Sequence, residues 1–317
     1  MRLERWLGII TKRVDSTEDY NLWSKKSLRR DNAMQVPIER KSCMEITGGR
    51  KSEDVQYEMP GLRMRVFSKQ SQQGLEGGGE IHFVSSCASG RITRMLIADI
   101  CGSESIFKQF SCQIRDGLLK SINSIWQNRV VDEMEQQLTE FAAQGGFATA
   151  SIATFFAPTR SFVMCNIGNP PPIVYRKQKR NWEVIHGTQQ TGESDNGDEL
   201  SSIEGVFTKG EYRFIETKLE VGDHFLLYGN GFAQSTFPGG DVVGHSRLLS
   251  ALQDATHTNP ETRVEHLVRL IREASKDSED STMLACTITD QSVGLRNNLL
   301  APIRLLRKAK DNTNLND

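Results

Sequence analysis

The sequence has no long hydrophobic run and almost no net charge, and each absence excludes a class of protein. No apolar stretch approaches the roughly 20 residues that a membrane-spanning helix needs, and residues 7–10 are too short for the core of a signal peptide. We therefore expect no membrane span and a cytoplasmic location. The net charge is -1 at pH 7, so bulk electrostatics give no reason to expect nucleic acid as a partner.

The sequence also lacks the spacings of common cysteine, histidine and phosphate-loop sites. It has six cysteines and no Cys-x-x-Cys pair, which is typical of reduced core thiols rather than of disulfides or zinc ligands. The histidines show no metal-ligand spacing, and residues 74–79 lack the Gly-Lys-Ser/Thr ending of a nucleotide-binding loop. Cys87 is followed by Arg91 and Arg94, which is superficially similar to a thiolate-arginine phosphate loop. The arginine spacing and the lack of an immediately following helix pattern argue against a cysteine phosphatase.

Composition divides the 317 residues into three parts. Residues 1–57 carry an excess of basic side chains and only short apolar clusters, which indicates a partly ordered N-terminal arm. Residues 58–290 contain the periodic patterns of a compact domain, interrupted by a polar, acidic surface loop at 187–211. Residues 291–317 predict a basic tail helix. The sequence assigns no role to the arm or to the acidic loop.

Strand and helix patterns alternate through residues 58–290. Residues 62–67 alternate apolar with basic side chains, as expected of a strand with one solvated face, and residues 81–84 predict a second strand. Residues 95–98 form an apolar run typical of a strand covered on both faces. Apolar residues at steps of three and four predict helices within 107–125, 130–141 and 261–275. Their apolar stripes must cover a sheet.

Acidic or amide side chains stand at the ends of four predicted strands. Asp99 follows the apolar run, and a hairpin turn would bring it beside Glu80 on the neighbouring strand. Asn230 lies between two glycines after the strand at 225–228, and Asp280 precedes the strand at 283–288. Taken alone, an acid such as Asp99 more often caps a turn than holds a metal ion. The presence of an acidic or amide side chain at four strand ends favours the metal-site interpretation more than a single acid does.

Short motifs surround these positions in a fixed order. The segments are Gly78-Gly79-Glu80, Ala98-Asp99-Ile100-Cys101-Gly102, Phe147-Ala148-Thr149-Ala150, Gly168-Asn169-Pro170-Pro171, Val221-Gly222-Asp223, Leu226-Leu227-Tyr228-Gly229-Asn230-Gly231 and Glu279-Asp280-Ser281-Thr282. In this order and spacing they resemble the SpoIIE-type branch of the metal-dependent PP2C (PPM) protein serine/threonine phosphatases. Each motif alone is weak, whereas the collinear series across about residues 60–290 is a strong signal.

The resemblance implies a fold, an activity and a set of ligands. The fold is α+β, a four-layer α-β-β-α sandwich of two mainly antiparallel sheets. The activity is hydrolysis of phosphoserine or phosphothreonine by a water activated between two Mn²⁺ or Mg²⁺ ions. By the same resemblance, Asp99 is the catalytic residue that bridges both metals and the Ile100 carbonyl is a backbone ligand. Glu80, Asn230 and Asp280 complete the shell, and the implied partner is a phosphorylated regulatory protein similar to an anti-sigma-factor antagonist.

Three positions depart from the family pattern. Glu80 and Asn230 stand where the family has aspartates, which lengthens one ligand and removes a negative charge from another. We therefore expect one of the two ions to be held weakly. Asn169 replaces a family histidine outside the metal shell. These changes predict a phosphatase of weakened activity or, as the alternative, a catalytically degenerate domain that binds a signalling partner. Metal titration separates the two, and the sequence does not indicate the oligomeric state.

Overall fold

The fold is described from a computed structural model of the chain. It describes residues 36–40, 45–71, 78–87, 90–124, 127–144, 146–189, 212–235, 242–253, 259–274 and 280–291. Pro37–Asp317 forms a compact unit separate from Met1–Val36, and the description concerns that unit. The tail helix expected at 291–317, apart from residue 291, and most of the acidic loop lie outside the described residues. None of the helices in the described part of the chain is long and apolar enough to cross a bilayer.

Two seven-stranded sheets form the centre of this unit. In spatial order, the first consists of β1 (Ile38–Arg40), β3 (Glu53–Met59), β4 (Leu62–Lys69), β14 (Ser281–Ile288), β13 (His224–Tyr228), β9 (Ile173–Arg176) and β10 (Asn181–Val184). The second consists of β11 (Thr188–Gln189), β12 (Tyr212–Lys218), β8 (Ser161–Ile167), β7 (Phe147–Phe156), β6 (Ile92–Cys101), β5 (Gly79–Cys87) and β2 (Glu45–Gly49). Neighbouring strands are antiparallel apart from the parallel pair β1 and β3.

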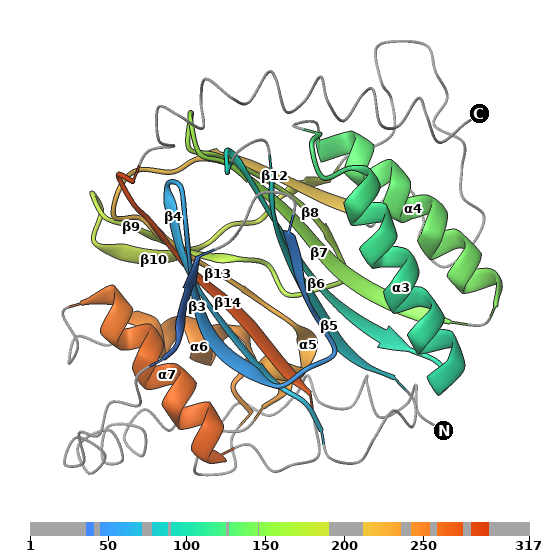
Figure 1. Cartoon of the computed structure of the whole chain (residues 1–317). Coiled ribbons are helices and arrows are strands. Elements are labelled where there is room, and N and C mark those ends of the chain that lie inside the picture. The colour runs from blue at the N-terminus through green and yellow to red at the C-terminus, as the bar shows by residue number, and fades with distance from the viewer. Residues whose placement is uncertain are drawn as a thin grey trace. The chain divides into compact units, whose positions relative to one another are not determined.

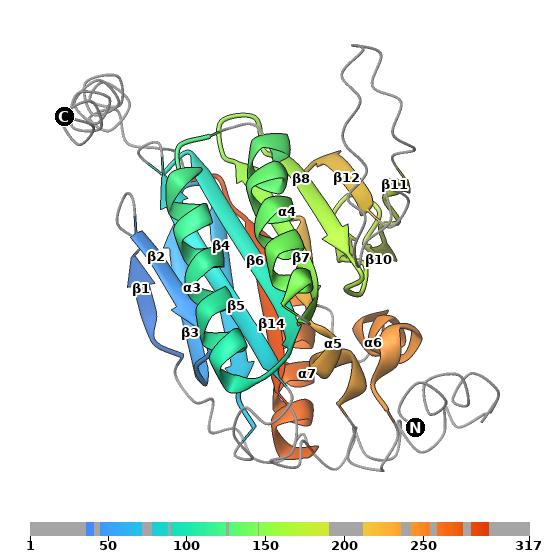
Figure 2. The same cartoon turned by 90° about the vertical axis from the view of Figure 1, so that its right-hand side faces the viewer.

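Helices cover the outer face of each sheet. Helices α3 (Glu104–Lys120) and α4 (Gln127–Ala143) lie over the second sheet, and α6 (Gly244–Gln253) and α7 (Pro260–Ala274) lie on the side of the first sheet (Figures 1 and 2). Three apolar clusters fill the spaces between the four layers, and Phe162, Phe110 and Leu248 are fully buried examples from each. The expected four-layer α-β-β-α sandwich of mainly antiparallel sheets is confirmed.

The local patterns explain why these segments form these elements. In β4, Leu62, Met64 and Val66 are buried while the basic residues between them are less so, as the alternation predicts. Helix α3 begins after Ser103, whose side chain accepts a hydrogen bond from the Ile106 N–H at 3.5 Å. Its buried stripe turns toward the second sheet.

Strand pairing begins earlier than the boundary expected at residue 58. Strands β1 and β2 precede that position and β3 begins before it, and these three strands join both sheets. The described residues of β1 and β2 include no buried one, so the apolar signal that marks a strand is weak there. Strand β3 buries Val55, Tyr57 and Met59 at alternate positions, a pattern typical of a strand that was nevertheless not predicted. Helix α6 and the short helix α5 (Asn230–Gln234) were also not predicted.

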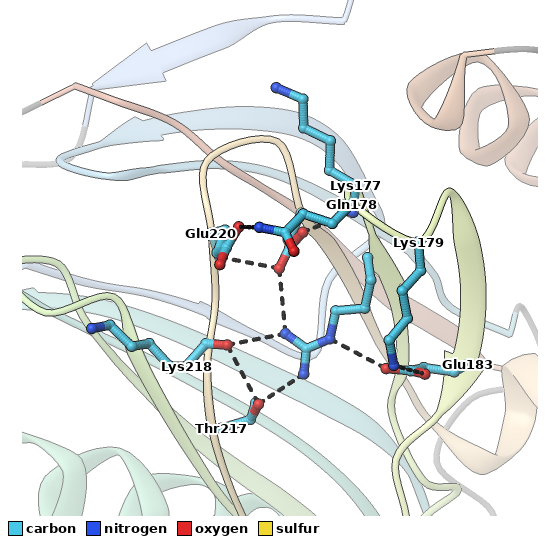
Figure 3. A network of polar contacts seen from close by, with 9 residues as sticks. Lys177, Gln178, Lys179, Glu183, Thr217, Lys218 and Glu220 are labelled. Carbon is cyan, nitrogen blue, oxygen red and sulfur yellow. Dashed lines mark hydrogen bonds and ion pairs between the residues drawn. The ribbon is translucent and has the colours of Figure 1, made fainter.

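A polar network ties the two sheets together at the β9–β10 turn (Figure 3). Arg176, at the end of β9, donates hydrogen bonds to Thr217 Oγ1 at 2.7 Å and to the Lys218 carbonyl at 3.0 Å, both on β12 of the other sheet. It also lies 3.3 Å from Asp223, whose carboxylate accepts hydrogen bonds from the backbone N–H groups of Lys177 and Glu220. The Val-Gly-Asp motif therefore lies at the beginning of β13, whereas Asn230 follows the end of the same strand.

Candidate metal centre

Glu80 and Asp99 lie directly opposite each other on neighbouring strands. They are paired in the antiparallel register of β5 and β6, as the sequence predicted. Glu80 is buried, with 1% of its surface exposed, and Asp99 is partly buried. On the other side of Asp99, the paired residue on β7 is Thr149. Two carboxylates therefore share one end of the second sheet.

Asp280 reaches the same place from the first sheet. It precedes β14, and its Oδ2 accepts a hydrogen bond from the Glu80 backbone N–H at 2.9 Å. Its Oδ1 accepts one from the Ser71 N–H at 2.6 Å and lies 3.4 Å from Arg50 Nη2. This carboxylate connects the beginning of β14 to the beginning of β5. The two sheets therefore meet at three carboxylates, those of Glu80, Asp99 and Asp280, which form the acidic cluster.

The glycines beside Asn230 make room for the Glu80 side chain. Glu80 Oε1 accepts a hydrogen bond from the Gly231 N–H at 2.7 Å. A methyl group at Gly229 would overlap the Glu80 carboxylate, and one at Gly231 would overlap the Asp280 carbonyl. Asn230 thereby stands at the start of α5, next to the cluster. The Gly-Asn-Gly sequence is required by close approach rather than by a turn.

The Asn230 amide belongs to a network with a second altered position. Its Nδ2 donates to Thr149 Oγ1 at 3.0 Å and to Asn169 Oδ1 at 3.4 Å, and Thr149 donates to Asn169 Oδ1 at 2.7 Å. Asn169 in turn donates to the Ile97 carbonyl at 3.2 Å. Asn230 and Asn169, the two asparagines at positions where the resemblance predicts other residues, therefore contact each other.

The cluster is electrostatically strained. Burial and the negative charge of Asp99 raise the pKa of the Glu80 carboxyl well above its usual value, although hydrogen bonds from Gly231 and Thr282 oppose the change. Burial and the charge of Asp280 raise the pKa of Asp99 to about 6. Carboxylates packed in this way favour a nearby cation, because a positive charge stabilises their ionised forms.

The oxygen donors fit a hard divalent cation in chemical type. Glu80 Oε2 is buried and has no hydrogen-bond partner among the described residues, which is an orphaned acceptor of the kind that an ion satisfies. The positions of the side chains fit less well than their chemical type. Within the described ranges, no group of three His, Cys, Asp or Glu side chains is placed to hold a metal ion. The Ile100 carbonyl, the predicted backbone ligand, lies against Gly78 at the same strand end.

Three residues of this region were not identified from the sequence. Arg50 follows β2 inside the segment interpreted as an arm, and nothing local connects it to Asp280. Ser71 contributes only its backbone, which leaves no sequence signal. Thr282, which supports Glu80, falls within the quoted Glu-Asp-Ser-Thr motif, where its spacing from Asp280 could have indicated a role.

The positions of Cys87 and Arg94 argue against a cysteine phosphatase. The Cys87 thiol is buried and donates to Asn123 Oδ1. Arg94 is also buried, and its guanidinium donates to Thr154 Oγ1 at 3.2 Å and to the Ser121 and Ser124 carbonyls. An arginine committed to internal acceptors anchors β6 to the end of α3 and is not available to a phosphate.

Comparison with known proteins is decisive for the family. The family model described as Stage II sporulation protein E (SpoIIE) matches residues 93–289, which is more than half of the chain. The chain belongs to the SpoIIE family. The resemblance to SpoIIE-type PP2C phosphatases is thus confirmed, and the domain is a phosphatase-type domain of that family. Asp99, Asn230 and Asp280 fall inside the matched range and Glu80 falls outside it. No curated protein matches this SpoIIE-family chain in sequence.

Solved structures share the fold of this SpoIIE-family domain. The RsbU and RsbW domains of Rv1364c from Mycobacterium tuberculosis match with a TM-score of 0.53 and 17% identity, covering 74% of this chain and 62% of that one. RsbX in complex with magnesium matches with a TM-score of 0.51 and 16% identity, over 74% of this chain and 100% of RsbX. The SiaA-PP2C domain of Pseudomonas aeruginosa matches with a TM-score of 0.52 and 15% identity, over 71% of this chain and 85% of that domain.

Proposed function

We propose that the protein is a metal-dependent serine/threonine phosphatase that acts on a phosphorylated regulatory protein. The observation that carries this proposal is the meeting of strand ends from both sheets, which gathers Glu80, Asp99 and Asp280 at one end of the sandwich. Carboxylates on separate rigid strands suit a hard cation better than a mobile organic ligand. Membership of the SpoIIE family supports the same chemistry.

In this proposal Asp99 is the central ligand and the catalytic residue. The Ile100 carbonyl, Glu80, Asn230 and Asp280 complete the shell. The ions are Mn²⁺ or Mg²⁺, and the magnesium in the RsbX complex supports that choice. The sequence predicts two ions with one held weakly. A bound divalent cation lowers the pKa of a coordinated water and stabilises negative charge on phosphoryl oxygens.

The chain's own groups hold these ligands in place. The Gly231 N–H and the Thr282 hydroxyl orient the Glu80 carboxylate. The Ser71 and Glu80 N–H groups orient Asp280. Asn230 Nδ2 is engaged by Thr149 and Asn169, so its Oδ1 is the side-chain atom that serves as a ligand in this proposal. The rigidity that these bonds provide is what a precise ion site needs.

The proposed substrate is phosphoserine or phosphothreonine on a regulatory protein similar to an anti-sigma-factor antagonist. This assignment follows from the family resemblance, and the cytoplasmic location stays a prediction from the sequence. The net charge of -1 gives no support to a nucleic-acid substrate.

The test is hydrolysis of p-nitrophenyl phosphate and of a phosphoserine peptide by the purified full-length chain across a Mn²⁺ series. We expect slow hydrolysis that requires a high Mn²⁺ concentration and is lost on chelation. Asp99→Ala should abolish it, because the central ligand is removed. Full activity in Asp99→Ala would disprove the role of Asp99. Absence of activity in both the parent and Asn230→Asp would end the enzyme proposal.

A second candidate is a degenerate domain that binds a signalling partner without hydrolysis. It is favoured by one observation: the Asn230 amide is used as a hydrogen-bond donor toward Thr149 and Asn169, where a carboxylate could only accept. The same assay separates the candidates. Capture of a partner by a chain that shows no Mn²⁺-dependent hydrolysis, even as Asn230→Asp, would support binding.

A further inference from the structure

Arg50 brings a positive charge into the acidic cluster from a distant part of the chain. Its Nη2 lies 3.4 Å from Asp280 Oδ1, and its side chain is only 21% exposed. Arg50 follows β2, the edge strand of the second sheet, whereas Asp280 precedes β14 in the first sheet. The ion pair therefore bridges the two sheets at the proposed metal centre.

A glycine provides the space in which this pair forms. A Cβ at Gly79 would lie 2.6 Å from Asp280 Oδ2 and 3.0 Å from Arg50 Nε. Any larger residue at position 79 would displace the carboxylate or the guanidinium. The position of Arg50 is thus part of the local packing around Glu80, and the pair is more than a contact between long surface side chains.

The charge of the cluster depends on this arginine. Glu80, Asp99 and Asp280 contribute a carboxylate each, and position 230 contributes none because it is asparagine. With the guanidinium of Arg50 included, fully ionised carboxylates leave two uncompensated negative charges, which one divalent cation balances. A second dication would have to enter a site that is already neutral and would face the guanidinium at Asp280.

We propose that Arg50 takes the place of one divalent cation, so that the cluster holds a single Mn²⁺ or Mg²⁺ ion. The inference rests on the proposed function, since it concerns the same cluster. Arg50 is a positioning residue here: it neutralises Asp280 and excludes a second ion, and the chain uses an internal cation where the resemblance predicted a weakly held metal.

The experiment counts Mn²⁺ ions bound per full-length chain by isothermal titration calorimetry. We expect one ion in the parent. Arg50→Met keeps the aliphatic stem and removes the charge, so the ion should bind about tenfold more tightly. Combining Arg50→Met with Asn230→Asp should raise the count to two. Two ions in the parent, or an unchanged affinity in Arg50→Met, would overturn the proposal.

Two control variants separate charge from packing. Arg50→Lys retains the charge and should keep the parent's affinity. Arg63→Met removes an arginine paired with Glu58 and Glu261 near the other end of β4 and should leave metal binding unchanged. Urea unfolding in EDTA checks that each chain folds, and the Mn²⁺-induced rise in Tm gives a second reading of affinity. A gain in Arg63→Met equal to that in Arg50→Met would contradict a local effect.

The outcomes also distinguish this inference from the proposed function. Tighter Mn²⁺ binding by Arg50→Met without any hydrolysis of the phosphoserine peptide would retain Arg50's role and reject the phosphatase. Hydrolysis with an affinity that does not respond to Arg50→Met would retain the phosphatase and reject Arg50's role. Failure of every chain to bind Mn²⁺ would reject both.

Discussion

Asn230→Asp introduces the carboxylate that the resemblance predicts at this position, and the structure predicts that it destabilises the metal-free chain. The Asn230 Nδ2 donates to Thr149 Oγ1 at 3.0 Å and to Asn169 Oδ1 at 3.4 Å. The Thr149 hydroxyl donates to Asn169 and the Asn169 atom at this contact is its Oδ1, so in this arrangement neither contacting atom offers a hydrogen to a carboxylate, and Thr149 can supply one only by giving up its bond to Asn169. An aspartate would set acceptor against acceptor at both contacts.

The expected magnitude follows from these contacts. Two lost hydrogen bonds cost about 1 kcal/mol each, and partly buried acceptors without donors add roughly 1–2 kcal/mol. The new charge also lies beside Glu80, which is already buried near Asp99 and Asp280. We therefore expect the free energy of unfolding in EDTA to fall by about 3 kcal/mol. Saturating Mn²⁺ should return most of this loss, since an ion at 100 times its Kd stabilises the folded state by about 2.7 kcal/mol.

The assay is urea-induced unfolding of the parent and of Asn230→Asp, each in EDTA and in excess Mn²⁺. Asn181→Asp is the matched control, because Asn181 is exposed and its Oδ1 already accepts a hydrogen bond from Gln253. It should change stability by less than about 0.5 kcal/mol in either buffer. Equal stability of the parent and Asn230→Asp in EDTA, or a smaller Mn²⁺ gain in the variant, would refute the reasoning.

Three further changes test other parts of the structure. Gly231→Ala should lower stability by about 2–3 kcal/mol in thermal unfolding, because its methyl group would overlap the Asp280 carbonyl. Burial lowers the pKa of His224 to about 4, below its unfolded value. The neutral form of His224 therefore contributes stability that is fully present above pH 6.5 and is lost as the pH falls through 4. The loss in the free energy of unfolding is about 3 kcal/mol. Urea unfolding measured at a series of pH values should show a weaker pH dependence for His224→Gln than for the parent. Arg94→Met should cost about 3 kcal/mol in urea unfolding, because it leaves the Ser121 and Ser124 carbonyls without their donor.

Each of these has a contrary result. A Gly231→Ala chain with the parent's Tm would mean that α5 can move away from Asp280 at no cost. If His224→Gln lost stability at low pH as the parent does, the loss would have to come from other titrating groups. A fully stable Arg94→Met chain would show that the end of α3 does not depend on this anchor.

The central strands could be predicted because their patterns are local. The alternation at 62–67 and the apolar run at 95–98 set which residues face the core, and a hairpin between β5 and β6 then placed Glu80 opposite Asp99. Strands β1 and β2 are short and have no buried residue among those described, so their sequence carries no strong apolar pattern. Strand β3 does alternate, with Val55, Tyr57 and Met59 buried, and its pattern was missed.

The supporting residues of the cluster could not be predicted for a different reason. Arg50 and Asp280 are 230 positions apart, and Asn230 and Asn169 are 61 apart. Such contacts depend on how the two sheets are placed, and no periodicity records that. Nothing in the local sequence explained the glycines on both sides of Asn230, whereas in the structure Gly229 packs against the Glu80 carboxylate and Gly231 against the Asp280 carbonyl. Tertiary packing decided what local sequence left open.

The most direct test of the central claim is phosphate release from a phosphoserine peptide by Asn230→Asp, measured across a Mn²⁺ series beside the parent and Asp99→Ala. The account predicts release that begins at lower Mn²⁺ in Asn230→Asp than in the parent and is absent in Asp99→Ala. No release from Asn230→Asp at any Mn²⁺ concentration, or equal release from all three chains, would contradict it.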